Sequence, residues 1–353
     1  MKLELAHGTA DLFTVSPRTS DETLYWKNIE TVMRLSDRYG YTGLLIFTGN
    51  DVLIDPWVVA QRVVSETRQL SPLVAINPLY THPFTAARFI SSYAHLYGRR
   101  TYVNLVTGAA LSAQQALGDT LPHDERYERL QEYAEVMQRL LTSPSVSHEG
   151  RHYRVSNLQL MSRPPEALRP GFLLAGQSEA ALVTAKALGA VSMQMLPATL
   201  EDGLRAGVRG VHFGIITRPH EAEAWKAARA LFPEDPLGQS VLEFSMRNTD
   251  AEWKWRMKMA AEGASASRQG FWLEPFRNFK ADCPYFVGSH AQVAALLDAL
   301  VRRGIDTIIL DIPPLEEEFH HIDLALKQAA TAPAAPPPGA LSVGTSPRAL
   351  AQD

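Results

Sequence analysis

The sequence contains one cysteine, Cys283, among 353 residues. A single thiol excludes an intramolecular disulfide and any metal site built from several cysteines. No apolar run approaches the roughly 20 residues that a membrane-spanning helix needs. The first residues, "MKLELAHGTADLF", are too polar for the apolar core of a secretory signal. We therefore expect a cytoplasmic protein that does not bind membranes.

The sequence also lacks a large excess of charge of either sign. The formal net charge is −4, and basic residues are scattered singly, so nucleic acid is not an expected partner. Signature motifs for dinucleotide binding, phosphate-binding loops, serine hydrolases and zinc proteases are absent as well. The adjacent His320 and His321 have no third ligand in view, and we expect no metal.

What the sequence does contain is a repeated alternation of short Val-, Ile- and Leu-rich runs with helix-length periodic segments. Such βα repetition is typical of parallel sheets. Strands are predicted at 2–6, 42–47, 73–76, 101–106, 171–176, 190–193, 211–216 and 307–310, and helices at 23–39, 56–67, 83–96, 123–141, 178–188, 220–231 and 291–302. About eight strands over this length favour a TIM (β/α)8 barrel with insertions over a doubly wound sheet.

Three stretches depart from this rhythm. Residues 142–170 are rich in turn formers and predict an excursion, with a small hairpin as one possibility. Residues 232–286 are long and aromatic-rich, and we expect an insertion that acts as an active-site lid. Residues 331–353 are rich in Pro and Ala without apolar periodicity and are predicted to be disordered. The barrel domain should span residues 1–330.

In a barrel, chemistry belongs at the carboxyl ends of the strands. Small or polar residues follow several predicted strands there, namely His7 in "AHGTAD", Thr48 in "TGND", Ala75 in "VAINPL", and Val106 and Thr107 in "NLVTG". None of these is diagnostic alone. His7 could equally be a surface residue, and Thr48 could lie in an ordinary loop.

Two segments together point to an anion. In "LLAGQSEAALVTAKAL", a strand ends at Gly176, and Gln177 and Ser178 stand where a helix begins. Free N–H groups at a helix start favour a phosphate, although Ser178 could simply cap its helix. In "HDERYERLQEY", His123 and Tyr127 lie one turn apart on one helix face and could converge on the same anion or form a solvated helix start.

Six motifs in order resemble those of the bacterial luciferase-like flavin monooxygenases, nearest to the alkanesulfonate monooxygenase branch. They are "DRYGYTGLLIFTGND…DPW", "THPFTAARF", "GRRTYVNLVTG", "HDERYERLQEY", "LLAGQSEAA" and "VGSHAQVAALLDALVRRGIDTIILDIPPLEEEF". They span nearly the whole chain apart from its C-terminal tail.

The resemblance implies a two-component monooxygenase. Such an enzyme takes reduced FMN (FMNH2) from a separate NAD(P)H:flavin reductase and reacts it with O2 to a flavin C4a-(hydro)peroxide. His123 and Tyr127 match the family's pair at the flavin phosphate, and Gly176, Gln177 and Ser178 match the loop that receives it. Thr48, Val106 and Thr107 match positions near the cofactor, and Ala75 matches a strand position where the family often has a non-prolyl cis peptide bond. Family members are usually dimers or tetramers, so we expect a homodimer or homotetramer.

The substrate is where this sequence departs from the alkanesulfonate branch. The branch's "R-x-H" pair aligns with His212, Phe213 and Gly214; its tyrosine in "SGYPH" is replaced near Ile312, and its cysteine near Val52 and Leu53. Oxidation at nitrogen or carbon of a small or carrier-protein-bound substrate is therefore favoured over desulfonation. The polar candidates left for catalysis are His7, His212 and Arg277.

Three alternatives remain open at this point. They are a desulfonating monooxygenase, an oxidoreductase that uses the deazaflavin F420 for hydride transfer, and a catalytically silent flavin-binding protein. The sequence does not discriminate among them.

Overall fold

Eight parallel strands form a closed ring in the computed structural model, which describes residues 2–19, 21–263 and 267–331. The ring closes because the last strand pairs with both its predecessor and the first strand. In ring order the strands are β2 (Gly8–Val15), β3 (Gly43–Ile46), β4 (Ser71–Ile76), β5 (Tyr102–Leu105), β8 (Gly171–Ala175), β9 (Val191–Met195), β10 (Gly210–Arg218) and β14 (Thr307–Asp311). The predicted TIM barrel is confirmed.

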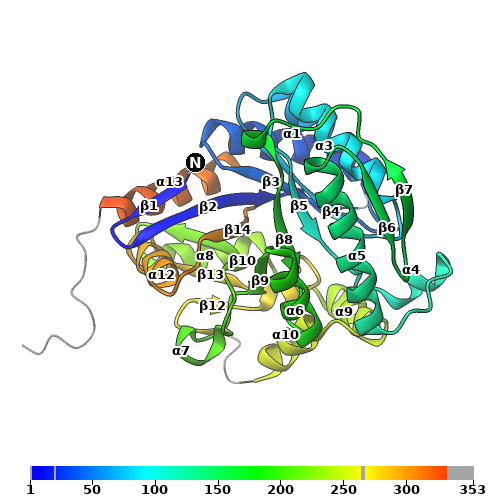
Figure 1. Cartoon of the computed structure of the whole chain (residues 1–353). Helices are drawn as coiled ribbons and strands as arrows, with labels where there is room; N and C mark the ends of the chain where they lie inside the picture. Colours follow the sequence, from blue (N-terminus) through cyan, green and yellow to red (C-terminus); the bar gives the residue numbers. More distant parts are fainter. Residues whose placement is uncertain (1, 20, 264–266, 332–353) are drawn as a thin grey trace, which may run out of the picture.

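Helices surround this ring (Figure 1). They are α1 (Glu22–Arg38), α2 (Pro56–Glu66), α3 (Pro83–Tyr97), α4 (Leu111–Ala116), α5 (His123–Thr142), the short η1 (Glu166–Leu168), α6 (Glu179–Leu188), α7 (Leu200–Gly203), α8 (Glu221–Leu231), α12 (His290–Arg302) and α13 (Glu316–Thr331). Local chemistry sets their starts: Asp55 caps α2 and is followed by Pro56, and Ser289 and Gln292 form a capping box on α12. No helix in the described part of the chain is long and apolar enough to cross a membrane.

The opening strand differs from the prediction. Strand β1 (Lys2–Leu5) is antiparallel to β2 and lies outside the ring, so the expectation that residues 2–6 form the first barrel strand is wrong. The burial pattern gives the reason. Four consecutive buried residues end β2, as a strand covered on both faces requires, whereas β1 alternates like an edge strand.

The barrel interior is filled by side chains that alternate along each strand. The inward cluster contains Phe13, Val15, Leu45, Leu73, Ala75, Leu173, Met193 and Ile309. Strand register extends this set, since Asn104 pairs with Ala75, and His212 pairs with Ile309. Neighbouring residues in a parallel ladder face the same side, so both polar side chains point into the barrel.

The two excursions take the expected form in part. Residues 142–170 contain the antiparallel hairpin β6 (Val146–Glu149) and β7 (Arg154–Leu158), which confirms the hairpin. Residues 232–286 contain α9 (Pro236–Arg247), α10 (Glu252–Glu262), β11 (Ser267–Arg268), β12 (Phe271–Trp272) and α11 (Glu274–Arg277). Strand β13 (Tyr285–Ser289), which the sequence did not predict, then runs parallel to the second half of β10.

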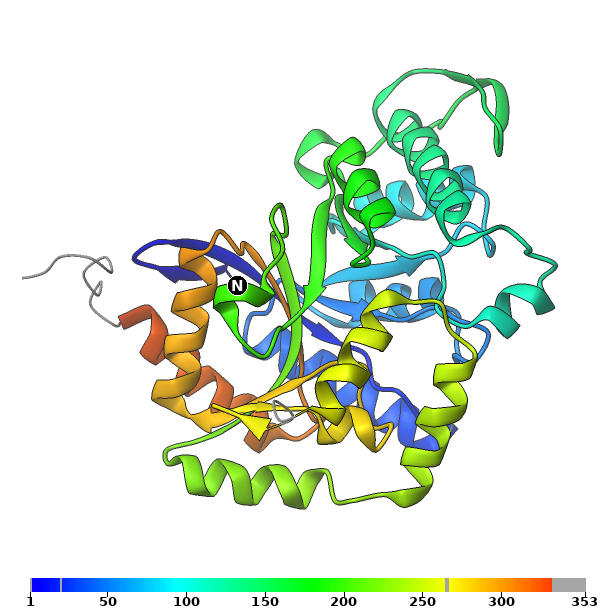
Figure 2. The ribbon, with the colours of Figure 1, turned by 90° about the horizontal axis from the view of Figure 1, so that it is seen from below.

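The insertion lies on the side of the barrel away from β1 (Figures 1 and 2). Its backbone is tied to the segment that follows β5, because Leu111 N–H donates to the Asn248 carbonyl at 3.0 Å. The Thr249 hydroxyl also donates to the Ala109 carbonyl at 2.7 Å. These contacts hold the insertion at the carboxyl ends of the strands. The predicted disordered tail, apart from Thr331 at the end of α13, lies outside the described residues.

Candidate active site

Three residues predicted at the phosphate, Tyr127, Gly176 and Ser178, meet around the Tyr127 hydroxyl together with Thr107, which was predicted near the cofactor. Tyr127 is buried in the first turns of α5, and its hydroxyl forms hydrogen bonds with the side chains of Thr107 and Ser178. Burial raises the pKa of Tyr127, so the phenol is a neutral donor at physiological pH. Gly176 completes the group: a Cβ there would lie 2.5 Å from the Tyr127 oxygen. Three segments distant in sequence thus meet at one polar spot.

His123 stands at the edge of this spot. Its ring centroid is 5.2 Å from that of Tyr127, and its Nδ1 lies 2.6 Å from Asp124 Oδ1, which leaves Nε2 as the atom available to a ligand. The N-cap position of α5 is Pro122, which supplies no side-chain hydrogen bond to the first turn. The first N–H groups of α5 are therefore open to an anion.

Ser178 caps its helix, as one of its two interpretations has it, and it also contacts Tyr127. Its oxygen accepts from Ala181 N–H at 3.2 Å as a helix cap, and its hydroxyl also reaches Tyr127. Gln177 is buried, and its carbonyl accepts a hydrogen bond from Arg205, whose charge sequence reasoning missed. Arg205 also lies 3.8 Å from Glu179. A cation beside this loop favours an anionic ligand.

Next to this polar spot, small residues lie at the carboxyl ends of the barrel strands. Ala75 is small and points inward, and Val106 directly follows β5. Asn104, which the sequence did not single out, points to the same side, and its Oδ1 is buried with no partner among the described residues. Thr48 follows β3 and is half-buried. No cis peptide bond occurs in the described part of the chain, so the one that the resemblance implies near Ala75 is absent.

These features fit a flavin mononucleotide. A phosphate needs N–H and O–H donors at a helix start, and Gly176 leaves space where any side chain would fill the cradle. A flat ring system needs small residues and a polar edge, which Ala75 and the unsatisfied Asn104 supply.

The three catalytic candidates are not brought together. His7 is exposed in the turn between β1 and β2, at the amino end of the barrel, so the reason for choosing it, a position after the first barrel strand, does not hold. Arg277 is exposed on α11 and pairs with Glu274 at 3.0 Å. His212 alone points into the barrel; burial lowers its pKa to about 4, and its Nε2 has no partner in the described residues.

Two further groups escaped sequence reasoning. Arg126, fully buried in α5, bonds to Gln114 and Asp250, and so ties the phosphate helix to the insertion. Asp311 ends β14 and accepts hydrogen bonds from the Tyr285 hydroxyl and the Cys283 thiol, whose sulfur lies 3.7 Å away. Burial raises the pKa of Asp311 to about 6. The phenol comes from β13 and the thiol from the residues just before it, so only the tertiary structure could reveal this cluster.

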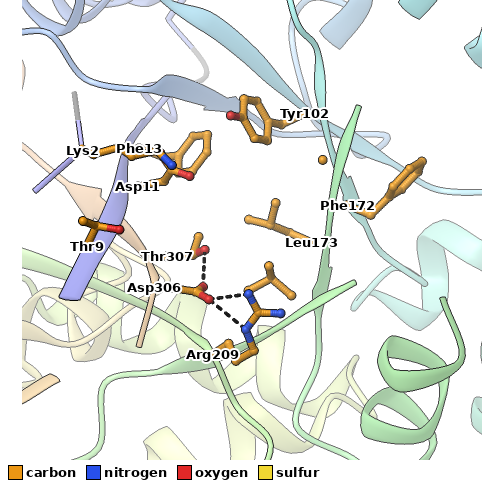
Figure 3. Close-up of a pocket in the computed structure, with 12 residues that line it drawn as sticks. Lys2, Thr9, Asp11, Phe13, Tyr102, Phe172, Leu173, Arg209, Asp306 and Thr307 are labelled. Carbon is orange, nitrogen blue, oxygen red and sulfur yellow. Dashed lines mark hydrogen bonds and ion pairs between the residues drawn. The ribbon is translucent and has the colours of Figure 1, made fainter. Parts of the chain in front are cut away.

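A cavity of about 280 Å³ opens at the opposite, amino end of the barrel (Figure 3). It is bordered by the starts of β2 and β14 and by an ion pair in which Arg209 Nε lies 2.8 Å from Asp306 Oδ2. Arg209 and Asp306 neutralise each other there, and barrel enzymes place their chemistry at the carboxyl ends. We therefore assign the active site to the carboxyl end.

The model of the luciferase-like monooxygenase family matches residues 6–307. The chain belongs to the luciferase-like monooxygenase family. It is accordingly a flavin-dependent monooxygenase. Among curated proteins, it is similar to the 4-(gamma-L-glutamylamino)butanoyl-[BtrI acyl-carrier protein] monooxygenase BtrO of Niallia circulans, with 34% identity over 312 residues, 84% of this chain and 89% of that protein.

Solved structures of the same fold agree. The EDTA monooxygenase EmoA from Chelativorans sp. BNC1 is 17% identical with a TM-score of 0.67, over 92% of this chain and 95% of that one. The oxygenating constituent of 3,6-diketocamphane monooxygenase from Pseudomonas putida, in complex with FMN, is 15% identical with a TM-score of 0.65, over 91% and 97%. At these identities the likeness shows the luciferase-like fold alone.

Proposed function

We propose that this protein is the oxygenase component of a two-component system, which receives FMNH2 from a separate NAD(P)H:flavin reductase and consumes O2. The observation that carries the proposal is the meeting of Thr107, Tyr127 and Ser178 over the Gly176 cradle. This cluster supplies neutral donors at a helix start, the chemistry that a terminal phosphate requires. Bound reduced flavin supplies the electrons that activate O2.

The residues of the chain then have positional roles. His123 and Tyr127 hold the phosphate, with Gln177 and Ser178 at the opposite side of it. Ala75, Val106 and Thr48 border the ring, and Asn104 offers its unsatisfied Oδ1 to a ring donor. His212, neutral in the barrel interior, is available to exchange a hydrogen bond with the reacting groups.

The insertion, residues 232–286, has the role of a lid that excludes water. Arg126 supports this assignment, since its buried charge joins the phosphate helix to Asp250 at the beginning of α10. A lid coupled to the cofactor helix would close when flavin binds. The catalytic domain in this proposal is the barrel of residues 1–330, assembled as a homodimer or homotetramer in the cytoplasm.

The substrate we propose is an acyl group carried on an acyl-carrier protein and oxidised at nitrogen or carbon. The activity for which BtrO is named concerns such a carrier-bound acyl group, and its 34% identity to this chain supports the choice. The replacement of the basic and phenolic residues of the alkanesulfonate branch around His212 and Ile312 also argues against desulfonation.

The test combines purified protein, a flavin reductase, NADH, FMN and ¹⁸O2. The substrates are 4-(γ-L-glutamylamino)butanoyl-carrier protein, the unacylated carrier and the free acid. We expect one labelled oxygen atom in the carrier-bound acyl group and little reaction of the free acid. Product labelled from water instead of O2, or oxygen consumption that yields only hydrogen peroxide with every substrate, would rule out the proposed reaction.

The deazaflavin alternative is tested in parallel, because the fold is shared with an F420-dependent secondary alcohol dehydrogenase at a TM-score of 0.61. Substrate oxidation with F420 in the absence of O2 would replace the monooxygenase proposal. If neither reduced FMN with O2 nor F420 supports turnover, while FMN still binds, the result would favour a catalytically silent flavin-binding protein.

A further inference from the structure

Three charged side chains gather at the carboxyl ends of two neighbouring barrel strands, away from the phosphate cluster. Arg18 lies three residues beyond the end of β2, and Asp311 is the last residue of β14. Lys254 comes from α10 of the insertion. Their charges act on one another, since Arg18 lowers the pKa of both Lys254 and Asp311. Carboxyl ends of the strands and insertion together define the mouth of the barrel.

Lys254 is a half-buried cation without a carboxylate. Its Nζ lies 3.1 Å from the Ser245 hydroxyl and 5.5 Å from the centre of the Trp253 ring, and no acidic oxygen lies within 4 Å among the described residues. Burial first, and the charge of Arg18 second, lower its pKa to about 8, and the more distant Asp51 carboxylate opposes them only in part. A desolvated ammonium beside another cation is unfavourable, and an anion between the two would relieve it.

A neighbour on the same helix shows what a structural lysine looks like. Lys258, one turn further along α10, has carboxylate oxygens of Glu243 at 2.8 Å and Glu262 at 3.6 Å. Those contacts raise its pKa, the opposite of the shift at Lys254. Carboxylates of the protein therefore neutralise Lys258, whereas Lys254 has no carboxylate within ion-pair distance among the described residues.

Arg18 is a half-exposed cation that lies beside two carboxylates. Its guanidinium pairs with Asp282, lies 3.8 Å from Asp51 and stacks 5.2 Å from the centre of the Phe47 ring. The side chain is 46% exposed, yet the surrounding protein still lowers its pKa through desolvation. The protein around Arg18 therefore removes part of its water and leaves the side chain within reach of a ligand.

Asp311 supplies the opposite charge. The Tyr285 ring lies against Gly214, where a Cβ would be only 2.3 Å from it, so the missing side chain lets the phenol reach Asp311. The carboxylate accepts from this phenol and from the Cys283 thiol, and has no ion pair within 4 Å among the described residues. Two neutral donors do not saturate a carboxylate, which has about four acceptor positions.

We propose that Arg18, Lys254 and Asp311 bind the outer end of the substrate's acyl chain, and that this end carries an amino group beside a carboxylate. Lys254 and Arg18 hold the carboxylate, and Asp311 holds the ammonium. This inference rests on the proposed function for its carrier-bound acyl substrate. Only a ligand with both charges satisfies the unpaired cation and the unpaired anion together.

The test measures binding without turnover. The probe is the N-acetylcysteamine thioester of 4-(γ-L-glutamylamino)butanoate, titrated by calorimetry into the protein with and without FMN. Two analogues complete the set: the glutarylamino compound, which lacks the amino group, and the 4-aminobutanoylamino compound, which lacks the α-carboxylate. Wild-type protein should bind the full probe about ten- to hundredfold more tightly than either analogue, as expected for a charge-assisted hydrogen bond.

Variants locate the two charges. Lys254→Gln should weaken binding of the two probes that carry the carboxylate and leave the third unchanged. Asp311→Asn should weaken only the two probes with an amino group, and Lys258→Gln, the matched control on α10, should weaken none. Equal weakening of all three probes, or no preference for the full probe in wild-type protein, overturns the proposal.

Two further outcomes separate the alternatives. If 4′-phosphopantetheine binds in a manner that Lys254→Gln abolishes and Asp311→Asn does not affect, the cations bind the carrier's phosphate, and the proposal is overturned. If the binding pattern holds while the ¹⁸O2 experiment fails, the charge-recognition site stands and the proposed oxygenation falls. If the ¹⁸O2 experiment succeeds but the binding pattern fails, the proposed oxygenation stands and the charge-recognition site is overturned.

Discussion

Replacing Tyr127 by phenylalanine removes one oxygen atom from the proposed phosphate site and leaves the ring in place. In the folded protein this oxygen bonds to the side chains of Thr107 and Ser178, and the residue is only 5% exposed. A hydrogen bond from a neutral donor to a charged phosphate contributes about 1.5–3 kcal/mol. We therefore expect FMN to bind Tyr127→Phe about ten- to hundredfold more weakly.

The assay compares FMN with riboflavin, which has the same ring and no phosphate. Quenching of flavin fluorescence gives both dissociation constants, and the reduced forms are titrated anaerobically. Tyr127→Phe should affect FMN much more than riboflavin, so the ratio of the two constants reports on the phosphate alone.

Tyr133→Phe is the matched control. It removes a phenol oxygen from the same helix, one that lies 3.2 Å from the Thr81 hydroxyl and apart from the Thr107–Ser178 cluster. The control should lose about 1 kcal/mol of unfolding free energy and keep its preference for FMN over riboflavin. If Tyr127→Phe keeps that preference too, or loses affinity equally for both flavins, the phosphate assignment is refuted.

Three further predictions concern packing and charge. Gly176→Ala should lower stability by about 1–3 kcal/mol and weaken FMN binding, because its Cβ would lie 2.5 Å from the Tyr127 oxygen; Gly263→Ala, with no atom closer than 3.5 Å, should do neither. Glu318→Gln should cost about 3 kcal/mol in urea unfolding, since it leaves the buried Arg218 charge without its bidentate partner, and a loss below about 1 kcal/mol would contradict this. Asp311→Asn should become more stable relative to wild type as pH rises from 4 to 6, by up to about 3 kcal/mol. In the folded protein the pKa of Asp311 is raised from 3.8 to about 6, so between these pH values the folded carboxyl holds a proton that the unfolded chain has released. Wild-type stability therefore falls as pH rises through this window. Parallel stability curves for the two proteins would refute the shift.

His212 influences the same pH window with the opposite sign. Its pKa is lowered from 6.5 to about 4 in the folded protein, so stability is lost as pH falls through this range. The two groups partly cancel in wild-type protein, which is why the Asp311 prediction compares a variant with wild type at each pH.

Much of the fold could be predicted because its pattern is local. Continuous apolar runs such as "GLLI" and "SPLVAI" mark strands covered on both faces, and each is followed by a capped, amphipathic helix. Prediction failed where local pattern and tertiary position diverge. Strand β1 has the composition of a strand but pairs outside the ring, and β13, where no strand was predicted, pairs with the second half of β10.

The candidate site divides in the same way. The family's ordered motifs pointed to His123, Tyr127 and Ser178, and the structure places Tyr127 and Ser178 in direct contact. His7 was chosen from a strand that proved to lie outside the barrel, and Arg277 from an insertion whose path had no sequence signal. Arg126 stood within a quoted motif, but nothing nearby in the sequence indicated its buried partner Asp250, 124 residues away.

By itself the sequence determined the alternation of strands and helices, the family and the segments that carry the proposed phosphate-binding residues, because each of these is written in short stretches of neighbouring residues. The tertiary structure alone decided which charges remain unpaired at the mouth of the barrel. Lys254 and Lys258 lie one turn apart on the same helix, and only the folded chain brings carboxylates to one and Arg18 to the other. Charge balance is a property of distances in space, and those distances join residues from opposite ends of the chain.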